Sequence, residues 1–338
     1  MIEIKTRRLF LKDTWTISRN SADFKDNVFV RIEKDGITGF GEAAPNLRYG
    51  EDHVKTTVHL NRIKSFIEKC NLCHYVDLKD KLFAAITGQN CARCALDIAI
   101  MDWVGKKMRL PLYRMWGLDH SRTPLTSYSI GIDTIEVVKK KVRQAENYPI
   151  LKIKVGGEHD EEIIETVRSF TDRPIRVDAN EGWKSKELAL EKIKWLQKMN
   201  IEFVEQPLPA DMIEETKWLR NRVEIPILAD EAVKTAADIP KLAEAYDGIN
   251  IKLMKAGGPQ EAMRMIYVAK TMKMKIMLGC MIESSIAISA AAHLSPLADW
   301  ADLDGNLLLK KDPYKGVGVE KGKLILSDQP GLGITGEF

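Results

Sequence analysis

Ionisable side chains stand at the ends of a series of short apolar segments in the second half of the chain. A buried strand of a parallel sheet is normally apolar on both faces, so charges repeated at one end of several strands are candidates for chemistry. A single ionisable residue at a strand end is explained by a hydrogen bond to a loop. A set of such residues at the same end of several strands is not explained in this way. The set comprises Lys152, Lys154, Asp178, Glu205, Asp230, Glu231, Lys252, Asp302 and Asp304.

Three carboxylates of this set, Asp178, Glu205 and Asp230, end consecutive segments. If the three strands are neighbours, the carboxylates converge, and they cannot all remain ionised without a cation among them. Hard oxygen ligands without a nearby His or Cys match Mg²⁺. We therefore expect a Mg²⁺ site; the alternative is that the surrounding lysines alone balance the three charges.

The segments that must position these residues alternate regularly with segments of helical character. Eight such alternations predict an α/β fold with a (β/α)8 barrel over residues 113–309. An open doubly wound sheet is the alternative, but no Gly-rich dinucleotide fingerprint follows any strand. The eight apolar segments are residues 126–132, 149–155, 174–180, 201–207, 225–231, 248–254, 275–281 and 300–305.

Lys154 and Lys252 belong to the second and sixth of these strands. In a ring of eight these strands face each other, so the two lysines would approach a bound molecule from opposite sides. They could remove a proton from one face of a carbon and deliver one to the other. A lysine acts as a base only if its pKa is lowered, and we expect Lys152, on the same strand face as Lys154, to lower it. Deprotonation beside a carboxylate creates an enediolate, which a divalent cation stabilises.

Asp302 and Asp304 share one face of the eighth strand, opposite the strands of the expected metal site. Two acids at this position would suit a cationic group at the other end of a substrate. The alternative is a local role, in helix capping or in a turn over residues 302–306.

The first part of the chain has the pattern of an α+β module. Residues 2–12, 27–36 and 37–45 predict an antiparallel meander with a hairpin turn at Asp35-Gly36. Three helical segments follow, so we expect a capping domain over residues 1–112. Residues 310–338 return to a strand-and-turn pattern and are expected to pack on this cap.

The balance of charges narrows the classes of partner. The 51 basic and 48 acidic residues give a net charge of only +3, which argues against a nucleic-acid protein held by bulk electrostatics. No apolar run is long enough for a signal peptide or a membrane span, so we expect a cytoplasmic protein without a membrane partner. We also expect a homo-oligomer.

Two C-x-x-C pairs, Cys70/Cys73 and Cys91/Cys94, have a spacing compatible with a four-cysteine zinc site. The second pair lies in a segment with helical periodicity, which favours core positions over a zinc-binding turn. Cys280 stands alone, and we expect all five thiols to be reduced.

Five motifs of the barrel segments resemble the enolase superfamily, in its muconate-cycloisomerase-like subgroup: KIK (152–154), DAN (178–180), EQP (205–207), ADE (229–231) and NIKLMKAGG (250–258). The resemblance covers the cap, the barrel and the C-terminal return. It implies that the acid/base pair and the Mg²⁺ ligands are Lys154, Lys252, Asp178, Glu205 and Asp230. It further implies that Lys152 tunes Lys154 and that Glu231 supports the metal site.

The D-x-D of the eighth strand is similar to that of the dipeptide epimerases of this subgroup. There it holds the free ammonium group of the substrate, and the C-terminal residue is epimerised. The resemblance implies this role for Asp302 and Asp304. The stretch GCMIES (279–284) is also similar, which implies that Cys280 and Ile282 face the peptide, and that Ser129 of the first barrel strand lies near it.

In Ala-Glu epimerases an arginine of the mobile loop after the first strand binds the glutamate side chain. The corresponding loop, residues 14–27, offers Arg19, one place before the aligned Asn20. Arg48, in the second cap loop, is the alternative.

The sequence therefore predicts a Mg²⁺-dependent dipeptide epimerase acting on an L-Ala-D/L-Glu-like dipeptide, in peptidoglycan peptide metabolism. The alternative is an o-succinylbenzoate synthase or a muconate-type cycloisomerase, which uses the same lysines and metal. Substrates of these enzymes carry no ammonium group, so two acids on strand eight would repel them. A non-catalytic binder of metal or peptide is a third reading, which the intact set of lysines and carboxylates disfavours.

Overall fold

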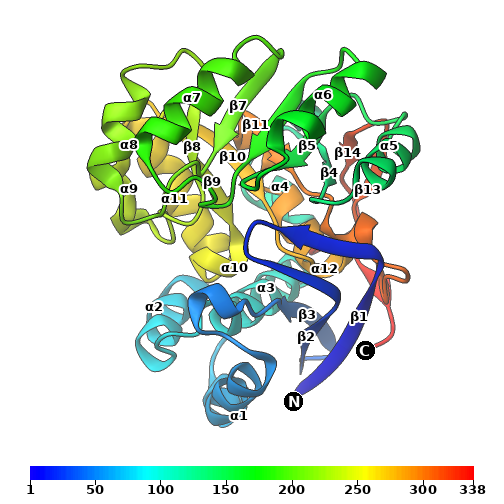
Figure 1. Cartoon of the computed structure of the whole chain (residues 1–338). Helices are drawn as coiled ribbons and strands as arrows, with labels where there is room; N and C mark the ends of the chain where they lie inside the picture. Colours follow the sequence, from blue (N-terminus) through cyan, green and yellow to red (C-terminus); the bar gives the residue numbers. More distant parts are fainter.

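The computed structural model describes all residues from 1 to 338 and consists of a barrel with a cap on one side (Figure 1). The cap holds an antiparallel sheet and three long helices; its elements are β1 Ile2–Ile17, β2 Asn20–Lys34, β3 Ile37–Ala43, α1 His53–Lys69, α2 Tyr75–Ala85 and α3 Asn90–Met108. The barrel strands are β4 Tyr128–Ile130, β5 Leu151–Lys154, β6 Ile175–Asp178, β7 Ile201–Glu205, β8 Ile227–Ala229, β9 Gly248–Lys252, β10 Lys275–Gly279 and β11 Trp300–Asp302. The other helices are α4 Leu112–Met115, α5 Ile135–Gln144, α6 Asp160–Phe170, α7 Lys186–Leu196, α8 Ile213–Arg220, α9 Ile239–Leu242, α10 Leu253–Ala256, α11 Pro259–Thr271 and α12 Ser285–Ala292.

The eight barrel strands are parallel and lie side by side in chain order from β4 to β11. A parallel bridge between Thr126 and Ala301 joins the two ends of this series, with Ser127 N donating to Ala301 O at 3.2 Å. Each strand falls within one of the eight predicted segments. The prediction of a closed barrel is therefore confirmed over that of an open doubly wound sheet.

The pairing of neighbouring strands places the charged residues at the strand ends beside one another around the barrel. Lys154 pairs with Asp178 across β5 and β6, and Asp178 pairs with Glu205 across β6 and β7. On the other side of the ring, Gly279 of β10 pairs with both Lys252 and Asp302. The charges predicted at strand ends thus meet at the carboxyl end of the barrel.

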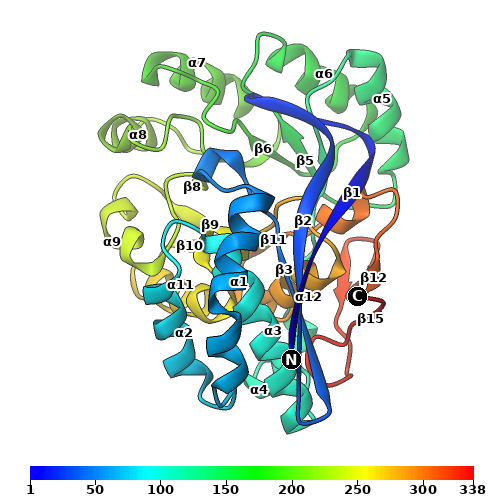
Figure 2. The ribbon, with the colours of Figure 1, turned by 90° about the horizontal axis from the view of Figure 1, so that it is seen from below.

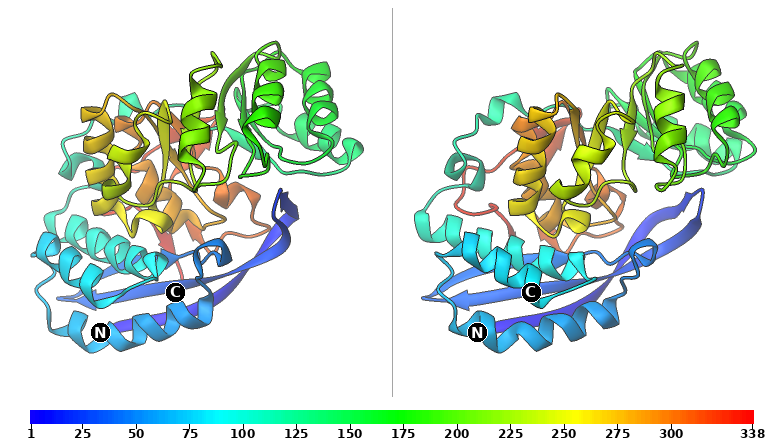
Figure 3. Two further views of the ribbon diagram at one scale, coloured as in Figure 1. Left: turned by 60° about the vertical axis from the view of Figure 1, so that its left-hand side comes forward. Right: turned by 90° about the vertical axis from the view of Figure 1, so that its left-hand side faces the viewer.

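The barrel helices cover the outside of the strands (Figures 1 and 3). In α11, Pro259 stands in the first turn, where its missing N–H has no partner to lose. Ala262, Met265, Ile266 and Ala269 are buried at helical spacing and pack inward. No helix has both the length and the apolar character to span a membrane.

The long β1–β2 hairpin corrects the assignment of residues 14–27 to a loop, because most of them belong to β1 and β2. After a register shift between Phe10 and Trp15, the two strands pair again up to Ile17 and Asn20. Cross-strand hydrogen bonds fix this end, for example between the hydroxyls of Thr16 and Ser21 at 2.9 Å. Figures 2 and 3 show the hairpin extending from the cap sheet to the edge of the barrel.

Helix α3 packs directly on the cap sheet because two glycines of β3 allow close approach. A Cβ added at Gly41 would lie 1.8 Å from Ala95 O, and one at Gly39 would lie 2.2 Å from Ala99 O. Cys91 and Cys94 are buried on this helix, whereas Cys73 is exposed. The cysteines form no metal-ligand cluster, so the four-cysteine zinc alternative is excluded and the core interpretation of Cys91 and Cys94 is confirmed.

The last part of the chain contains four short strands: β12 Tyr314–Lys315, β13 Gly318–Glu320, β14 Lys323–Ile325 and β15 Thr335–Gly336. Tyr314 packs its ring against Phe29 and Phe40 of the cap sheet, with ring centroids 5.6 and 5.9 Å away. The Phe338 ring also stacks on Phe40 at 6.4 Å. These contacts tie the C-terminal segment to the cap, and both termini lie on the cap side (Figure 1).

Candidate active site

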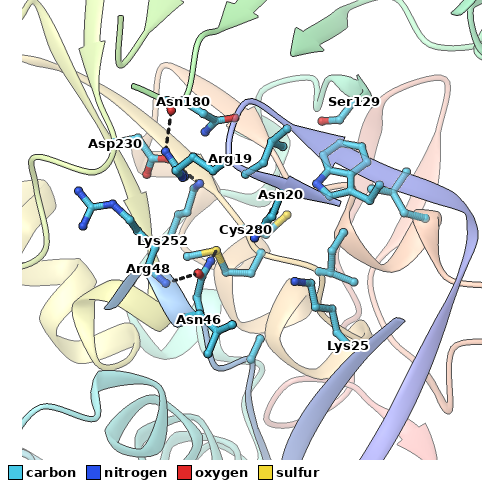
Figure 4. A pocket seen from close by; sticks show the side chains of 18 of the residues that line it. Arg19, Asn20, Lys25, Asn46, Arg48, Ser129, Asn180, Asp230, Lys252 and Cys280 are labelled. Carbon is cyan, nitrogen blue, oxygen red and sulfur yellow. Dashed lines mark hydrogen bonds and ion pairs between the residues drawn. The ribbon is translucent and has the colours of Figure 1, made fainter. Parts of the chain in front are cut away.

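A cavity of about 350 Å³ lies between the carboxyl ends of the barrel strands and the cap. This is a normal size for a small-molecule site. Figure 4 shows Asp230 and Lys252 on its barrel side and Arg19 and Lys25 on its cap side, and Arg48 also lines it from the cap. Two structural units therefore build the site, and each supplies charged groups.

The three carboxylates predicted to bind a metal converge beside this cavity. One oxygen from each of Asp178, Glu205 and Asp230 lies within 4.8 Å of the other two, and all three residues are buried. No other group of His, Cys, Asp and Glu side chains in the chain has this arrangement. Burial and the neighbouring charge of Asp178 raise the pKa of Glu205 to about 7. Three clustered acids are thus costly to ionise together, as the sequence led us to expect.

The donor atoms of this carboxylate cluster also match those that a hard cation such as Mg²⁺ requires. Glu205 Oε2 is buried and accepts no hydrogen bond, although Lys152 Nζ lies 2.7 Å away at an angle unsuited to one. Glu205 Oε1 accepts from Asn250 Nδ2 at 2.7 Å, which holds the carboxylate in place. An all-oxygen donor set with an oxygen atom free of hydrogen bonds suits Mg²⁺.

Lys154 and Lys252 line the cavity from β5 and β9, which are four strands apart in the ring of eight. Lys154 Nζ lies 2.5 Å from Asp178 Oδ2, and Lys252 Nζ lies 2.7 Å from Asp230 Oδ2. Burial lowers the pKa of Lys252, but the charges of Asp230 and Glu205 outweigh it and raise this pKa well above its usual value. The two ammonium groups thus stand on opposite sides of the cavity, each beside a carboxylate of the cluster.

Lys152, which the sequence predicts to tune Lys154, lies beneath the cavity, and that role stays a prediction. Its side chain is completely buried, does not line the cavity and lies 2.6 Å from Asp302 and 2.7 Å from Glu205. Burial lowers the pKa of Lys152, but the charges of Asp302, Glu205 and Asp178 raise it well above its usual value. These carboxylates balance its positive charge. It is a buried counter-ion beneath the site, without direct access to a substrate.

Asp302 and Asp304 both line the cavity but have different partners. Asp302 Oδ2 is paired with Lys152, and its Oδ1 accepts from Ser127 Oγ at 2.7 Å. Asp304 accepts from Ser129 N at 2.6 Å and has no cationic partner. Burial and the charge of Asp302 raise the pKa of Asp304 to about 7. The Asp304 side chain caps no helix, so the local alternative is not supported at this residue.

The remaining residues predicted to contact a substrate also reach the cavity. Ser129, Cys280 and Ile282 all line it. Ser129 Oγ donates to Asp302 Oδ1 at 3.3 Å, and Cys280 Sγ donates to Asp302 O at 3.3 Å. Ser129 and Cys280 therefore lie at the end of β11.

Both candidate arginines line the cavity but are already paired with carboxylates. Arg19 Nη2 lies 2.6 Å from Glu231 Oε1, and Arg19 Nη1 lies 3.0 Å from Glu181 Oε2. Arg48 donates to both oxygens of Glu181, at 2.9 and 2.8 Å. Ser18 adds a bond to Asn180 O at 2.9 Å. The arginines thus fasten the hairpin and the second cap loop to the barrel loop after β6.

Sequence reasoning missed three charged residues of the site. Glu181 receives both arginines, and Lys255 Nζ reaches back from α10 to Asp230 Oδ1 at 2.5 Å. Lys25 lines the cavity from β2. For Glu181 the available signal was adjacency to the motif DAN, whereas Lys255 lies within NIKLMKAGG but was set aside in favour of Lys252 because it lies beyond the strand. Lys25 lay in a segment wrongly interpreted as a loop, so no strand face could be assigned to it.

Comparison with known proteins agrees with this architecture. Residues 136–337 match the family model "Enolase C-terminal domain-like", and residues 2–117 match "Mandelate racemase / muconate lactonizing enzyme, N-terminal domain". The chain therefore belongs to the mandelate racemase/muconate lactonizing enzyme family of the enolase superfamily.

Individual relatives are similar over nearly the whole chain. The L-Ala-D/L-Glu epimerase of Bacteroides thetaiotaomicron is 41% identical over 98% of this chain and 85% of its own length. The L-Ala-D/L-amino acid epimerase of Pedosphaera parvula is 41% identical over 95% of this chain and 94% of its own. A dipeptide epimerase from Cytophaga hutchinsonii, solved with Mg and D-Ala-L-Val, superposes with a TM-score of 0.95 at 29% identity, covering 99% and 95% of the two chains.

Proposed function

We propose that the protein is a Mg²⁺-dependent dipeptide epimerase that inverts the α-carbon of the C-terminal residue of an L-Ala-D/L-Glu-like dipeptide. The observation that carries the proposal is the pair Lys154 and Lys252 on opposite sides of one cavity, each beside the same acidic cluster. The names of the relatives support the same activity.

The acidic cluster would hold the metal through Asp178, Glu205 and Asp230. A bound divalent cation supplies positive charge that favours loss of a proton beside the substrate carboxylate. The residues of the chain then move the proton. One lysine, as a neutral amine, takes the α-proton from one face, and the other, as an ammonium, returns a proton to the opposite face. The α-carbon inverts, and after product release both lysines return to their starting protonation states by exchanging protons with water.

Asp304 supports a dipeptide over the substrates of the alternative enzymes. It is buried, lines the cavity and has no cationic partner, so a substrate ammonium would provide its missing charge. An o-succinylbenzoate synthase or muconate cycloisomerase substrate is anionic and would be repelled there. The dipeptide interpretation therefore accounts for a residue that the cycloisomerase interpretation leaves unexplained.

The proposal is tested by following the α-protons of L-Ala-L-Glu in D₂O with the Mg²⁺-loaded protein. We expect deuterium to enter only the α-position of the glutamate, with formation of L-Ala-D-Glu, as seen by ¹H NMR. N-acetyl-L-Ala-L-Glu serves as a control because it lacks the ammonium. Absence of exchange with every dipeptide of an L-Ala-L-X panel would contradict the proposal, and turnover of a succinylbenzoate precursor instead would favour the alternative.

We further propose that the reaction takes place in the cytoplasm, within peptidoglycan peptide metabolism. All five cysteines are free thiols, including the exposed Cys73, which agrees with a reducing compartment. The L-Ala–Glu linkage of the proposed substrate supports the assignment to peptidoglycan peptides.

A further inference from the structure

Asn27, a buried residue of β2, lines the cavity from the cap. Its side-chain nitrogen donates to Glu42 Oε1 at 2.8 Å and to the carbonyl oxygen of Ile282 at 3.0 Å. A carboxylate and a carbonyl are both acceptors, so only the nitrogen end of the Asn27 amide can face them. Asn27 Oδ1 accepts no hydrogen bond from the chain and is not sealed inside the protein, so this oxygen is the atom of the amide that meets the cavity.

Glu42 of β3 holds the Asn27 amide in this orientation. The Glu42 carboxylate is completely buried without an ion-pair partner. It accepts from Ser284 N at 2.9 Å, from Ser284 Oγ at 2.6 Å and from Ala287 N at 3.3 Å. These donors belong to the N-cap and first turn of α12, where free N–H groups and the helix dipole favour an anion. Glu42 is thus a fixed acceptor, from which the Asn27 nitrogen cannot turn away without losing two hydrogen bonds.

Asn27 lies beside the part of the cavity that the peptide group of a dipeptide must cross. In the proposed reaction the α-carbon lies between Lys154 and Lys252, and the substrate ammonium lies at Asp304. The peptide group joins these two points. Strand β10 lies between β9, which carries Lys252, and β11, which ends shortly before Asp304. The loop after β10, which includes Ile282, therefore lies beside the peptide group, and Asn27 is hydrogen-bonded to this loop.

The free atom of Asn27 matches one of the two polar atoms of a peptide group. A peptide group has one donor, its N–H, and one acceptor, its C=O. Binding removes both from water, and a donor left without an acceptor in an enclosed site weakens binding. Asn27 Oδ1 is an acceptor without a donor, whereas the Asn27 nitrogen, which could bind a C=O, is already taken by Glu42 and Ile282. The oxygen therefore complements the N–H of the peptide group and not its C=O.

We propose that Asn27 binds the dipeptide by accepting a hydrogen bond from its peptide N–H, and that Glu42 is the positioning residue that keeps the Asn27 oxygen turned to the cavity. The inference rests on the proposed function and adds a residue that recognises the peptide bond itself, whichever side chains the dipeptide carries. The peptide nitrogen is bonded to the α-carbon that inverts. The hydrogen bond therefore also limits the rotation of this carbon between Lys154 and Lys252.

The test combines a variant of Asn27 with a substrate that lacks the N–H. The two substrates are L-Ala-L-Glu and its ester analogue, in which an oxygen replaces the peptide nitrogen, and α-proton exchange in D₂O gives kcat/KM for each. Asn27→Leu keeps the volume of the side chain without its polar atoms. We expect Asn27→Leu to lower the ratio of kcat/KM for dipeptide over ester by about 10-fold, a loss typical of one buried hydrogen bond. Asn61→Leu, at an exposed asparagine of α1, is the matched control and should leave the ratio unchanged.

Glu42→Gln tests the positioning role. The amide nitrogen that this substitution introduces can donate to Asn27 Oδ1 and turn it away from the cavity. We expect the dipeptide-to-ester ratio to fall by roughly 3-fold, chiefly through KM for the dipeptide. A merely structural role of Glu42 would slow both substrates alike and leave the ratio unchanged.

An unchanged ratio in Asn27→Leu would overturn the inference, because Asn27 would then contact only groups that both substrates carry, such as the ammonium. If Asn27→Leu does not fold, Asn27→Ala takes its place with the same expectation. An ester that binds without exchange is compared through its inhibition constant. The wild type separates this failure from that of the proposed function. If it exchanges no dipeptide, the proposed function fails; if it exchanges L-Ala-L-Glu and the ratio stays unchanged in the variant, only the role of Asn27 fails.

Discussion

The barrel wall and the cap wall of the cavity carry their charges in different ways. In the barrel wall, Lys154 and Lys252 lie within 2.7 Å of carboxylates that come from strands of the same sheet. In the cap wall, Arg19 and Arg48 are held by glutamates of the barrel loops, and Lys25 has no partner. The positive charges of the barrel wall are thus balanced by carboxylates of the barrel itself. The positive charges of the cap wall are balanced only by carboxylates of the barrel or by those of a ligand.

This difference matches two parts of the proposed reaction. Proton transfer at an α-carbon is the same for every dipeptide, so its groups belong on a wall whose positions are fixed by hydrogen-bonded strands. Choice of the side chain varies between relatives, some named for glutamate and one solved with D-Ala-L-Val. A wall built from a hairpin and a loop can change these contacts without disturbing the proton-transfer groups.

The largest effect is expected from the acidic cluster of the barrel wall. Glu205→Gln removes one of three charges that would hold Mg²⁺, and we expect activity to fall by about 10³-fold. Glu202→Gln is the matched control, since Glu202 lies on the same strand but bonds Arg176 and Trp300 away from the cavity. Steady-state epimerisation at saturating Mg²⁺ gives the comparison. A Glu205→Gln protein with more than a tenth of wild-type activity would show that the cluster is not the metal site.

How far the site could be predicted differs between the two walls. Strand alternation and chain order place Asp178, Glu205 and Asp230 together, because neighbouring parallel strands in register have little freedom. The same reasoning places Lys152 on the strand face of Lys154 but not at its depth, since a period of two gives the face of a strand and not the distance into the barrel. The partners of Arg19 could not be predicted at all: Glu231 lies 212 residues away, and the pairing depends on how the hairpin docks.

The second prediction concerns Asp304, at the other end of the barrel wall. Asp304→Asn keeps the bond from Ser129 N but loses the charge proposed to hold the ammonium. We expect KM for L-Ala-L-Glu to rise by about 30-fold, the usual loss for one charged hydrogen bond in a buried site. The KM of wild type and variant for the dipeptide should be compared at one pH. An unchanged KM would show that Asp304 does not bind the ammonium group of the substrate.

The third prediction concerns the boundary between the walls, where Glu283 is buried near Glu42 of the cap. Burial and the charge of Glu42 raise the pKa of Glu283 to about 8, above its usual value of 4.5. The folded state therefore holds this proton more tightly than the unfolded state does, and the resulting stability is lost as the pH rises through about 8. We expect Glu283 to lower the free energy of unfolding by roughly 2 kcal/mol between pH 6 and pH 9.

Glu283→Gln, which mimics the protonated carboxyl, should remove that part of the pH dependence. Urea unfolding of wild type and variant at pH 6 and pH 9 measures it. Glu320→Gln, an exposed glutamate on β13, is the control and should behave as the wild type does. Equal pH dependence of Glu283→Gln and wild type would show that Glu283 is ionised in the folded protein.

The central claim is that two lysines act on opposite faces of one α-carbon. It is tested most directly by following α-proton exchange of L-Ala-L-Glu and L-Ala-D-Glu in D₂O with Lys154→Ala and Lys252→Ala. We predict that each variant loses epimerisation by about 10³-fold. One variant should still exchange the α-proton of the L,L-epimer and the other that of the L,D-epimer. Exchange of the same epimer by both variants, or epimerisation at the wild-type rate by either, would contradict the account.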